Sequence, residues 1–229
     1  MEFWYDFATS VVRFYTTFFL HYQVKGRERI PPGPKIIVGN HPCATDSFVL
    51  PFIFKEKLHF AIQADIFEIA IVGRLLTLAG QIPVVMGQGH EMVKAGVRWL
   101  EKGHDIVIFP EGRLNYGKDF HRAGSGAALL ALQTGAPVLP IGIWSPPKFI
   151  RRIQSNVLNR PTDGGWQIGG KVFINIGDPL FLPKPVDSTR FYRHLRECTN
   201  QIMSQVSELV QQIQPPADSN PPLSPPVSS

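Results

Sequence analysis

The feature that most constrains the fold is a series of short apolar runs, each bounded by turn residues. The first run, residues 35–39 (Lys-Ile-Ile-Val-Gly), follows the turn Pro-Pro-Gly-Pro at 31–34. Runs of this length are typical of strands that are buried on both faces of a sheet. The same pattern predicts further strands at 59–62, 81–85, 105–109, 137–143 and 171–176.

Helical patterns lie between most of these runs. They predict helices at 45–54, 66–79, 90–102 and 123–134, and a longer helix at 189–213 that closes the fold. Strands that alternate with helices predict an α/β domain, with a mostly parallel mixed sheet flanked by helices and right-handed crossovers. A chain of 229 residues with 44% hydrophobic residues suits a single domain of this kind.

The first twenty residues predict an amphipathic helix that precedes the domain. Its apolar stripe contains Trp4, Phe7, Ala8, Val11, Phe14, Tyr15 and Phe18, and its polar stripe contains Glu2, Asp6, Thr9, Arg13 and Thr16. A secretory signal is not expected, because the segment opens with Glu2 and Asp6, carries Arg13 in its middle and lacks a small-residue cleavage site. A spanning helix is not expected either, because it would be apolar on every face. A helix rich in Trp and Phe fits the interface of a membrane, and packing on the protein's own core is the alternative.

These patterns divide the chain into three parts. Residues 1–30 are predicted as an interfacial helix and a polar link, and residues 31–214 as the folded domain. Residues 215–229 are rich in Pro and Ser without apolar periodicity, so this tail is predicted to be disordered.

The charge favours an anionic partner, because the formal net charge is +5 and the isoelectric point is about 9.3. Nucleic acid is not expected, since no nucleic-acid-binding motif accompanies the charge. The histidines lack metal-ligand spacing, so no metal is expected. Cys43 and Cys198 form neither a disulfide framework nor a CxxC motif, and a reducing cytosolic environment is the simpler interpretation.

The first candidate for chemistry is Asn40-His41-Pro42-Cys43-Ala44-Thr45-Asp46, directly after the first predicted strand. Sites in open α/β sheets lie outside the carboxyl ends of strands. Proline favours the first helical position, which would make His41 a cap residue. If the ring folds back toward Asp46, the carboxylate can orient it as a general base. A histidine and an aspartate with only a structural role at a helix start are the alternative.

The second candidate is Phe109-Pro110-Glu111-Gly112-Arg113, which follows another predicted strand. Glu111 offers an acceptor for hydroxyl groups, and Arg113 offers a fork for phosphate or carboxylate. A turn with a surface ion pair is the alternative. Two such loops at strand ends in one small sheet favour a functional site.

Two further features have a functional and a structural interpretation. Cys43 lies between His41 and Asp46, where it is either a nucleophile or a small core residue, and core packing is favoured. The basic residues Lys148, Arg151, Arg152 and Arg160 lie in a stretch with several Pro and Gly residues. That stretch is predicted as a mobile loop, which contacts lipid headgroups or coenzyme A phosphates or is simply a solvated basic patch.

The two loops together resemble the motifs of the glycerolipid acyltransferase family, which includes lysophosphatidate acyltransferases. That family is marked by Asn-His-x-x-x-x-Asp, here residues 40–46, and by Phe-Pro-Glu-Gly, here residues 109–112. The segment Phe-His-Arg-Ala-Gly at 120–124 and the run Val-Leu-Pro-Ile at 138–141 are similar to two further family segments. The resemblance covers about residues 35–143.

The resemblance implies an O-acyltransferase of phospholipid biosynthesis. It implies a fatty acyl thioester of coenzyme A or acyl carrier protein as co-substrate, no other cofactor, and direct attack by the hydroxyl of a lysophospholipid such as 1-acylglycerol-3-phosphate. His41 would be the base and Asp46 its partner. The acceptor would be bound by Glu111, Gly112, Arg113, Asn40 and Arg122. With the N-terminal helix, this places the enzyme on the cytoplasmic face of a membrane, as a peripheral or monotopic protein.

Two departures from the family pattern concern the acceptor. The family's second motif runs Gly-x-x-Phe-Ile-x-Arg, with the Arg on the acceptor's phosphate, and here Met86 takes that position. Arg113 also follows Gly112 without the usual spacer. Arg74, Arg98 or Arg122 are candidates for the missing charge, and an acceptor without a terminal phosphate is the alternative.

Two other functions stay open at this stage. One is a lipid-binding or scaffolding protein of the same fold that lacks turnover, which the change at Met86 favours and the intact His41 and Asp46 oppose. The other is an acyl-thioesterase, which would release the thiol without any acceptor.

Overall fold

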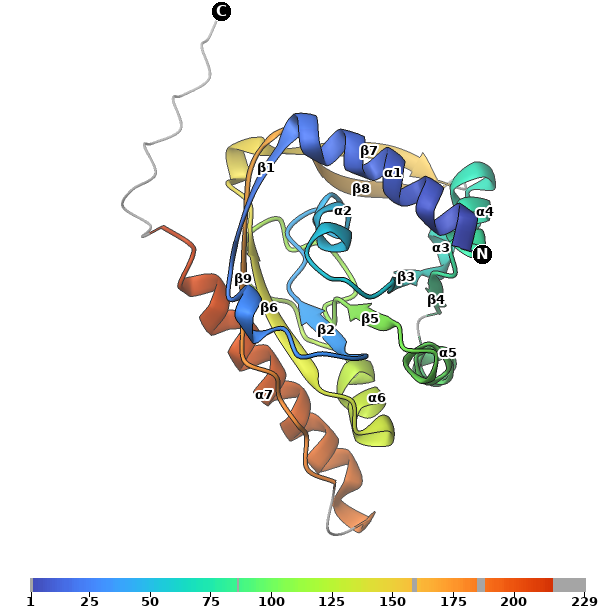
Figure 1. Ribbon diagram of the computed structural model, residues 1–229, viewed down its shortest axis with the longest axis vertical. Helices are drawn as coiled ribbons and strands as arrows, with labels where there is room; N and C mark the ends of the chain where they lie inside the picture. Colours follow the sequence, from blue (N-terminus) through green and yellow to red (C-terminus); the bar gives the residue numbers. More distant parts are fainter. Residues whose placement is uncertain (1, 86, 158–159, 185–187, 216–229) are drawn as a thin grey trace, which may run out of the picture.

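The computed structural model describes residues 2–85, 87–157, 160–184 and 188–215. A seven-stranded sheet has the order β1-β9-β6-β2-β5-β3-β4, and β7 and β8 form a separate two-stranded sheet (Figure 1). The strands are β1 Leu20–Lys25, β2 Ile36–Gly39, β3 Leu58–Gln63, β4 Ile82–Val84, β5 Asp105–Ile108, β6 Val138–Trp144, β7 Ile150–Val157, β8 Arg160–Gln167 and β9 Gly170–Ile176. Strands β6, β2, β5, β3 and β4 are parallel, while β9 runs antiparallel to β6. The predicted mostly parallel mixed sheet is confirmed.

The helices fall close to the predicted ranges. They are α1 Glu2–Phe19, α2 Asp46–Val49, α3 Ala64–Phe67, α4 Ala70–Leu78, α5 Gly89–Glu101, α6 Gly126–Thr134 and α7 Phe191–Gln211. Short 3-10 helices are η1 Arg27–Arg29, η2 Leu50–Phe52, η3 Pro147–Phe149 and η4 Ser188–Arg190. The single helix predicted at 66–79 is divided into α3 and α4. A Cβ on Gly73 would lie 1.7 Å from the carbonyl oxygen of Phe67, so only glycine permits this close contact between the two helices.

The central strands are buried on both faces, which explains their continuous apolar sequences. Ile36 and Val38 of β2 face one cluster, which includes residues of α5, α6 and α7. Ile37 faces the other cluster, which includes residues of α2 and η2. Figure 1 shows the corresponding layers, with α7 and α6 on one side of the sheet and α2 and α1 on the other.

Two segments predicted as irregular are strands instead. The predicted link after α1 contains β1, which pairs in parallel with β9 from Leu20↔Gly170 to Lys25↔Asn175. Its residues alternate in burial, so Leu20, Tyr22 and Val24 cover the edge of the sheet. The predicted mobile loop at 146–165 was also wrong, because β7 and β8 form an antiparallel hairpin in register from Ile150↔Gln167 to Val157↔Arg160.

Helix α1 presents some aromatic side chains to solvent and others to the core, against which Tyr15 packs. Phe14 and Phe18 are each 65% exposed, whereas Thr16 of the polar stripe is 1% exposed. Within the described residues, no helix is both long enough and apolar enough to cross a membrane. Met86, the side chain of Arg160 and residues 216–229 of the predicted disordered tail lie outside the described part of the chain.

Candidate active site

His41 and Asp46 meet at the carboxyl end of β2, in residues 40–46, which we term the His loop. Nδ1 of His41 lies 3.3 Å from Oδ2 of Asp46. The Asp46 side chain is fully buried and that of His41 is 17% exposed. An ionised carboxylate only accepts hydrogen bonds, so in the neutral ring this contact assigns the proton to Nδ1 and the lone pair to Nε2. Among the described residues Nε2 has no partner, and it is the nitrogen left for a substrate.

The His loop brings the two residues together by a turn and not by a helix. Helix α2 begins at Asp46 within the predicted range 45–54, but its N-cap is Thr45, so the prediction that His41 caps a helix with Pro42 at its first position was wrong. The N–H of Asp46 donates to the carbonyl of Cys43, 3.2 Å away, and this turn folds the carboxylate back toward the ring. The N–H of Cys43 donates to Oδ2 of Asp46 at 2.7 Å, which fixes the carboxylate.

Cys43 contributes a hydrogen bond and no nucleophile. Its side chain is buried, and its Sγ donates to Oδ1 of Asp46 at 3.1 Å. Burial, together with the neighbouring charge of Asp46, raises the pKa of the Cys43 thiol. A thiol that stays protonated and enclosed is the packing residue that the sequence favoured.

Phe109 orients the ring of His41, a role that the sequence did not single out. The two rings are stacked with their centroids 4.1 Å apart and their planes 5° apart. Phe109 directly follows β5, the neighbour of β2, so the stack joins the ends of two adjacent strands. The only signal in the sequence is the Phe of Phe-Pro-Glu-Gly itself.

The carboxylate of Glu111 accepts hydrogen bonds from three segments, at His41, Asn115 and His121. We term residues 109–117 the Glu loop. Oε1 of Glu111 accepts from the N–H of His41 at 3.4 Å and from Nδ2 of Asn115 at 2.8 Å. Its Oε2 accepts from the N–H of His121 at 2.8 Å. The carboxylate is buried and bonded within the protein, so it positions the backbone of His41.

Asn115 adds a second link that the sequence did not reveal. Its N–H donates to the carbonyl of His41 at 2.9 Å, while its side chain donates to Glu111. An asparagine in a loop carries no local signal for such a role.

Asn40 is placed in the core rather than toward a substrate. Its Nδ2 donates to the carbonyl of Ile143, and its Oδ1 accepts from the N–H of the same residue, each at 2.8 Å. Both ends of the amide are therefore used to join the His loop to β6. The structure corrects the expected substrate contact to a positioning role.

The remaining predicted acceptor residues lie at the exposed rim. Gly112 has a φ of 65°, which favours glycine, and its carbonyl accepts from Nε2 of Gln63. Arg113 and Arg122 are exposed, and within the described side chains neither forms an ion pair. They are available to an anionic ligand, and their role stays a prediction.

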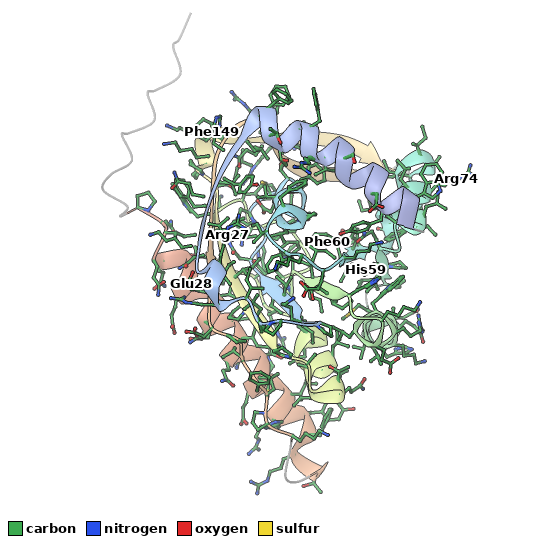
Figure 2. All side chains as sticks on the ribbon, viewed as in Figure 1. Arg27, Glu28, His59, Phe60, Arg74 and Phe149 are labelled. Carbon is green, nitrogen blue, oxygen red and sulfur yellow. The ribbon has the colours of Figure 1, made fainter. Side chains whose placement is uncertain are left out.

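The other arginines considered for acceptor binding lie away from the two loops. Arg98 is in the last turn of α5, which leads to the amino end of β5, opposite the site. Arg74 projects from α4 at the edge of the molecule (Figure 2).

The β7–β8 hairpin lies against the His loop. The N–H of Ala44 donates to the carbonyl of Gly165 at 2.8 Å. The N–H of Gln167 donates to Oγ1 of Thr45, also at 2.8 Å. Tyr15 of α1 donates its hydroxyl hydrogen to the carbonyl of Gln167, so α1 and the hairpin meet beside the His loop.

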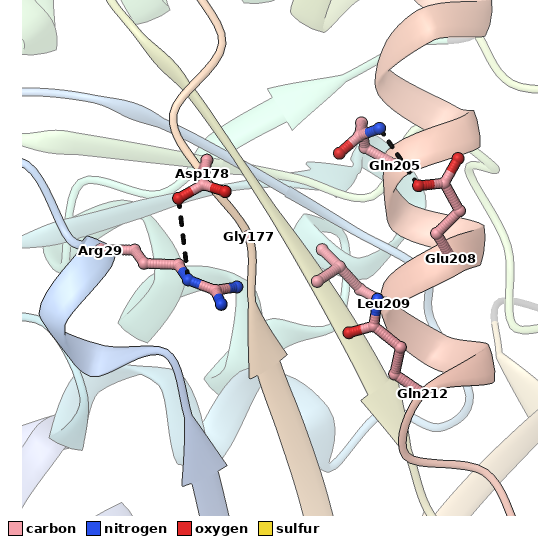
Figure 3. A pocket seen from close by; sticks show the side chains of 7 residues that line it. All are labelled: Arg29, Gly177, Asp178, Gln205, Glu208, Leu209 and Gln212. Carbon is pink, nitrogen blue, oxygen red and sulfur yellow. Dashed lines mark hydrogen bonds and ion pairs between the residues drawn. The ribbon is translucent and has the colours of Figure 1, made fainter.

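A polar hollow elsewhere offers no comparable chemistry. It has a volume of about 200 Å³ and is lined by Arg29, Gly177, Asp178, Gln205, Glu208, Leu209 and Gln212 (Figure 3). Arg29 is engaged by Asp178, with Nε 3.7 Å from Oδ1, and by the carbonyl of Ile176 at 2.9 Å. None of its lining residues belongs to the His loop or the Glu loop.

Comparison with known proteins gives a match to the family model described as Acyltransferase over residues 21–144, more than half of the chain. The 1-acyl-sn-glycerol-3-phosphate acyltransferase of Pseudomonas aeruginosa is 32% identical over 127 residues, which cover 53% of this chain and 49% of the relative. The enzyme of the same name from Borreliella burgdorferi is 30% identical over 131 residues, covering 55% and 52%. The chain therefore spans about half the length of these relatives.

Two further matches are another relative and a solved structure. A lyso-ornithine lipid O-acyltransferase of Pseudomonas aeruginosa is 26% identical over 126 residues, covering 54% of this chain and 48% of the relative. The crystal structure of the 1-acyl-sn-glycerophosphate (LPA) acyltransferase PlsC from Thermotoga maritima has a TM-score of 0.63. The match covers 92% of this chain and 82% of the Thermotoga maritima chain, at 18% identity. At this identity the similarity supports the fold alone.

Proposed function

The chain belongs to the Acyltransferase family, and from that premise we propose that it transfers a fatty acyl group from a thioester to the hydroxyl of a lysophospholipid, in phospholipid biosynthesis. The observation that supports this is the pairing of His41 Nδ1 with the buried Asp46, which leaves Nε2 without a partner among the described residues in a side chain that is partly exposed. The donor is a fatty acyl thioester of coenzyme A or acyl carrier protein.

The reaction needs a base that removes one proton. Nε2 of His41 takes the proton from the acceptor hydroxyl while the oxygen attacks the thioester carbonyl carbon. The buried carboxylate of Asp46 stabilises the imidazolium that forms. When the carbon–sulfur bond breaks, the leaving thiolate takes the proton from Nε2, so the enzyme returns to its starting state without an acyl-enzyme.

The stack on Phe109 and the bond from Asp46 hold the ring in one orientation before substrate binds. Pre-organisation of this kind lowers the barrier, because the ring loses no further freedom in the transition state. The hydrogen bonds of Glu111 and Asn115 to the backbone of His41 serve the same purpose.

We also propose that α1 lies on a membrane surface. Trp4, Phe14 and Phe18 are exposed on α1, and Ile71 and Val72 are exposed on α4, which contacts α1. Aromatic and aliphatic side chains that face solvent on one amphipathic helix fit the interface of a bilayer. Liposome flotation of the wild-type protein and of the Phe14→Ser/Phe18→Ser variant tests this. Binding that the double variant retains in full would contradict it.

The decisive experiment measures free-thiol release from palmitoyl-coenzyme A, with and without a panel of lysolipids. The proposed function predicts release that requires both an acceptor and His41, together with the acylated lipid in mass spectra. Release without any acceptor would indicate a thioesterase. Vesicle binding without release from either palmitoyl-coenzyme A or palmitoyl-acyl carrier protein would indicate the lipid-binding alternative.

A further inference from the structure

Arg152 of β7 lies beside the His loop and the Glu loop, where the sequence predicted a mobile basic loop that contacts lipid headgroups or coenzyme A phosphates or is simply solvated. Its guanidinium carbon is 4.1 Å from the ring centroid of Tyr116, in the Glu loop. A guanidinium over an aromatic face is held by the ring quadrupole, yet its N–H groups remain available around the edge. Arg152 is exposed and forms no ion pair with any described carboxylate.

Two series of contacts connect this arginine with the His loop. Arg152 is the cross-strand partner of Gly165, whose carbonyl accepts from the N–H of Ala44 in the His loop. Tyr116 follows Asn115, whose N–H donates to the carbonyl of His41 at 2.9 Å. Arg152 is therefore one strand away from the His loop and in contact with the Glu loop.

The close packing of the hairpin depends on a missing side chain. A Cβ on Gly165 would lie 2.7 Å from Cε1 of Tyr116, which is too close for any other residue without a shift. Tyr116 itself has a φ of 55°, an uncommon conformation for a residue other than glycine. Gly165 and Tyr116 thus let the hairpin bring Arg152 against the Glu loop.

The neighbouring Arg151 provides a natural contrast. Successive side chains of a strand point to opposite faces, so Arg151 lies on the face of its partner Trp166 and Arg152 on the face of Gly165 and Tyr116. The ring of Trp166 is 6.2 Å from that of Phe48 in α2. The two arginines carry the same charge on the same strand, but only Arg152 faces the Glu loop.

We propose that Arg152 binds the phosphate of the acceptor and so sets a preference for lysophosphatidate over uncharged acylglycerols. The inference rests on the proposed function. The free hydroxyl of 1-acylglycerol-3-phosphate must reach His41 Nε2, and its phosphate is only a few bonds from that hydroxyl. The phosphates of coenzyme A are separated from the thioester by the whole pantetheine arm, so a cation beside the His loop is in reach of the acceptor's phosphate rather than the donor's.

The test compares Arg152→Gln with Arg151→Gln, the matched control on the opposite face. Short-chain acceptors that stay monomeric, 1-hexanoylglycerol-3-phosphate and 1-hexanoylglycerol, remove any effect of membrane binding. Loss of a charge-assisted hydrogen bond should lower the ratio of kcat/KM for the phosphate acceptor over the neutral one by about 10-fold or more in Arg152→Gln, mainly through KM. Arg151→Gln should leave this ratio unchanged.

A second experiment varies the acyl donor and so distinguishes the acceptor's phosphate from the phosphates of coenzyme A. Palmitoyl-pantetheine lacks the nucleotide phosphates of palmitoyl-coenzyme A. If Arg152→Gln raises the KM of palmitoyl-coenzyme A and not that of palmitoyl-pantetheine, Arg152 binds the donor and the inference is wrong. Equal effects of the two arginine substitutions on the acceptor ratio would also overturn it.

Isothermal titration calorimetry measures binding of the acceptor without turnover, so it tests the phosphate site even if the protein transfers no acyl group. If the wild-type protein shows no transfer, the proposed function fails. In that case, weaker binding of 1-hexanoylglycerol-3-phosphate by Arg152→Gln than by Arg151→Gln would still support the phosphate site. Equal binding by both variants would contradict the proposed phosphate site.

Discussion

Polar and charged side chains lie at both ends of the strand pair β2–β5, but they differ in how deeply they are buried. At the amino end, Lys35 and Asp105 are completely buried, with Nζ 2.9 Å from Oδ2. Glu56 completes this cluster, since its Oε2 lies 3.0 Å from Nζ of Lys35. At the carboxyl end, His41 and Glu111 follow the same two strands, but the His41 side chain stays partly exposed. The Lys35–Asp105 pair has no exposed side-chain surface for a ligand, whereas the His41 side chain has some.

Two histidines show the same difference at the level of single atoms. His59, near the amino end, stacks on Trp99 with centroids 3.8 Å apart, much as His41 stacks on Phe109. Its Nδ1 contacts the carbonyl of Gly80 and its Nε2 contacts Nδ1 of His104, each at 2.8 Å. His41 has one nitrogen bonded and the other available. A ring whose two nitrogens are both bonded stabilises the fold, and a ring with one free nitrogen can take a proton.

The largest expected effect is that of His41→Ala on activity. Loss of the base should lower the rate of acceptor-dependent thiol release at least ~100-fold, at the low end of general-base contributions. His21→Ala, at an exposed position of β1, is the control and should retain the wild-type rate. Retained activity in His41→Ala would break the comparison, because the open end of the strands would then lack its proposed chemistry.

Lys35→Met should affect stability and leave the chemistry intact. Removing one partner of a buried pair leaves Asp105 uncompensated and should lower the free energy of unfolding by about 3–5 kcal/mol. Urea denaturation measures this, with Lys55→Met at an exposed position as control. The double change Lys35→Met/Asp105→Leu should recover much of the loss. A large fall in kcat of the folded Lys35→Met enzyme would contradict the separation of the two ends.

Glu111→Gln tests whether the buried carboxylate of Glu111 has a structural role, like that of Asp105, or contacts the ligand. The amide keeps one acceptor oxygen but turns an NH₂ group toward the N–H of His121 or toward the donors on Oε1, so one buried donor loses its partner. We expect the free energy of unfolding to fall by about 1–3 kcal/mol and kcat to fall with it, while the acceptor KM stays unchanged. A rise in acceptor KM with unchanged stability would instead assign Glu111 to the ligand.

The last prediction concerns the pH dependence of stability and leaves activity aside. Burial lowers the pKa of His59 from 6.5 to about 4, because desolvation disfavours the charged ring. The unfolded state then binds more protons between these values, so His59 favours folding above pH 6.5, and this contribution is lost as the pH falls toward 4. Denaturation at a series of pH values should show a flatter profile for His59→Gln than for the wild-type protein. Identical slopes would show that His59 is not held neutral.

Much of the fold was predictable because its signals are local. The strands buried on both faces show continuous apolar runs, and every strand predicted from such a run is present. The proximity of His41 and Glu111, 70 residues apart, followed from the rule that parallel strands end at one edge of a sheet.

The errors occurred where partners are distant. Strand β1 alternates apolar and polar residues and pairs with β9, far along the chain. Strands β7 and β8 have few apolar residues and pair with each other, and the hairpin packs on a distant segment at Ala44 and Thr45. Proline and glycine residues in the hairpin suggested a loop, although Gly165 is the residue that lets the hairpin approach Tyr116.

The sequence by itself determined the α/β architecture, the family and the His41–Asp46 pair, because apolar period and motif spacing are properties of short segments. Only the tertiary structure decided that Glu111 and Asn40 bond within the protein, and that Arg152 lies beside the Glu loop. The reason is physical. Which atom satisfies a buried carboxylate or amide depends on donors brought from other strands, and those donors meet it only when the sheet has formed.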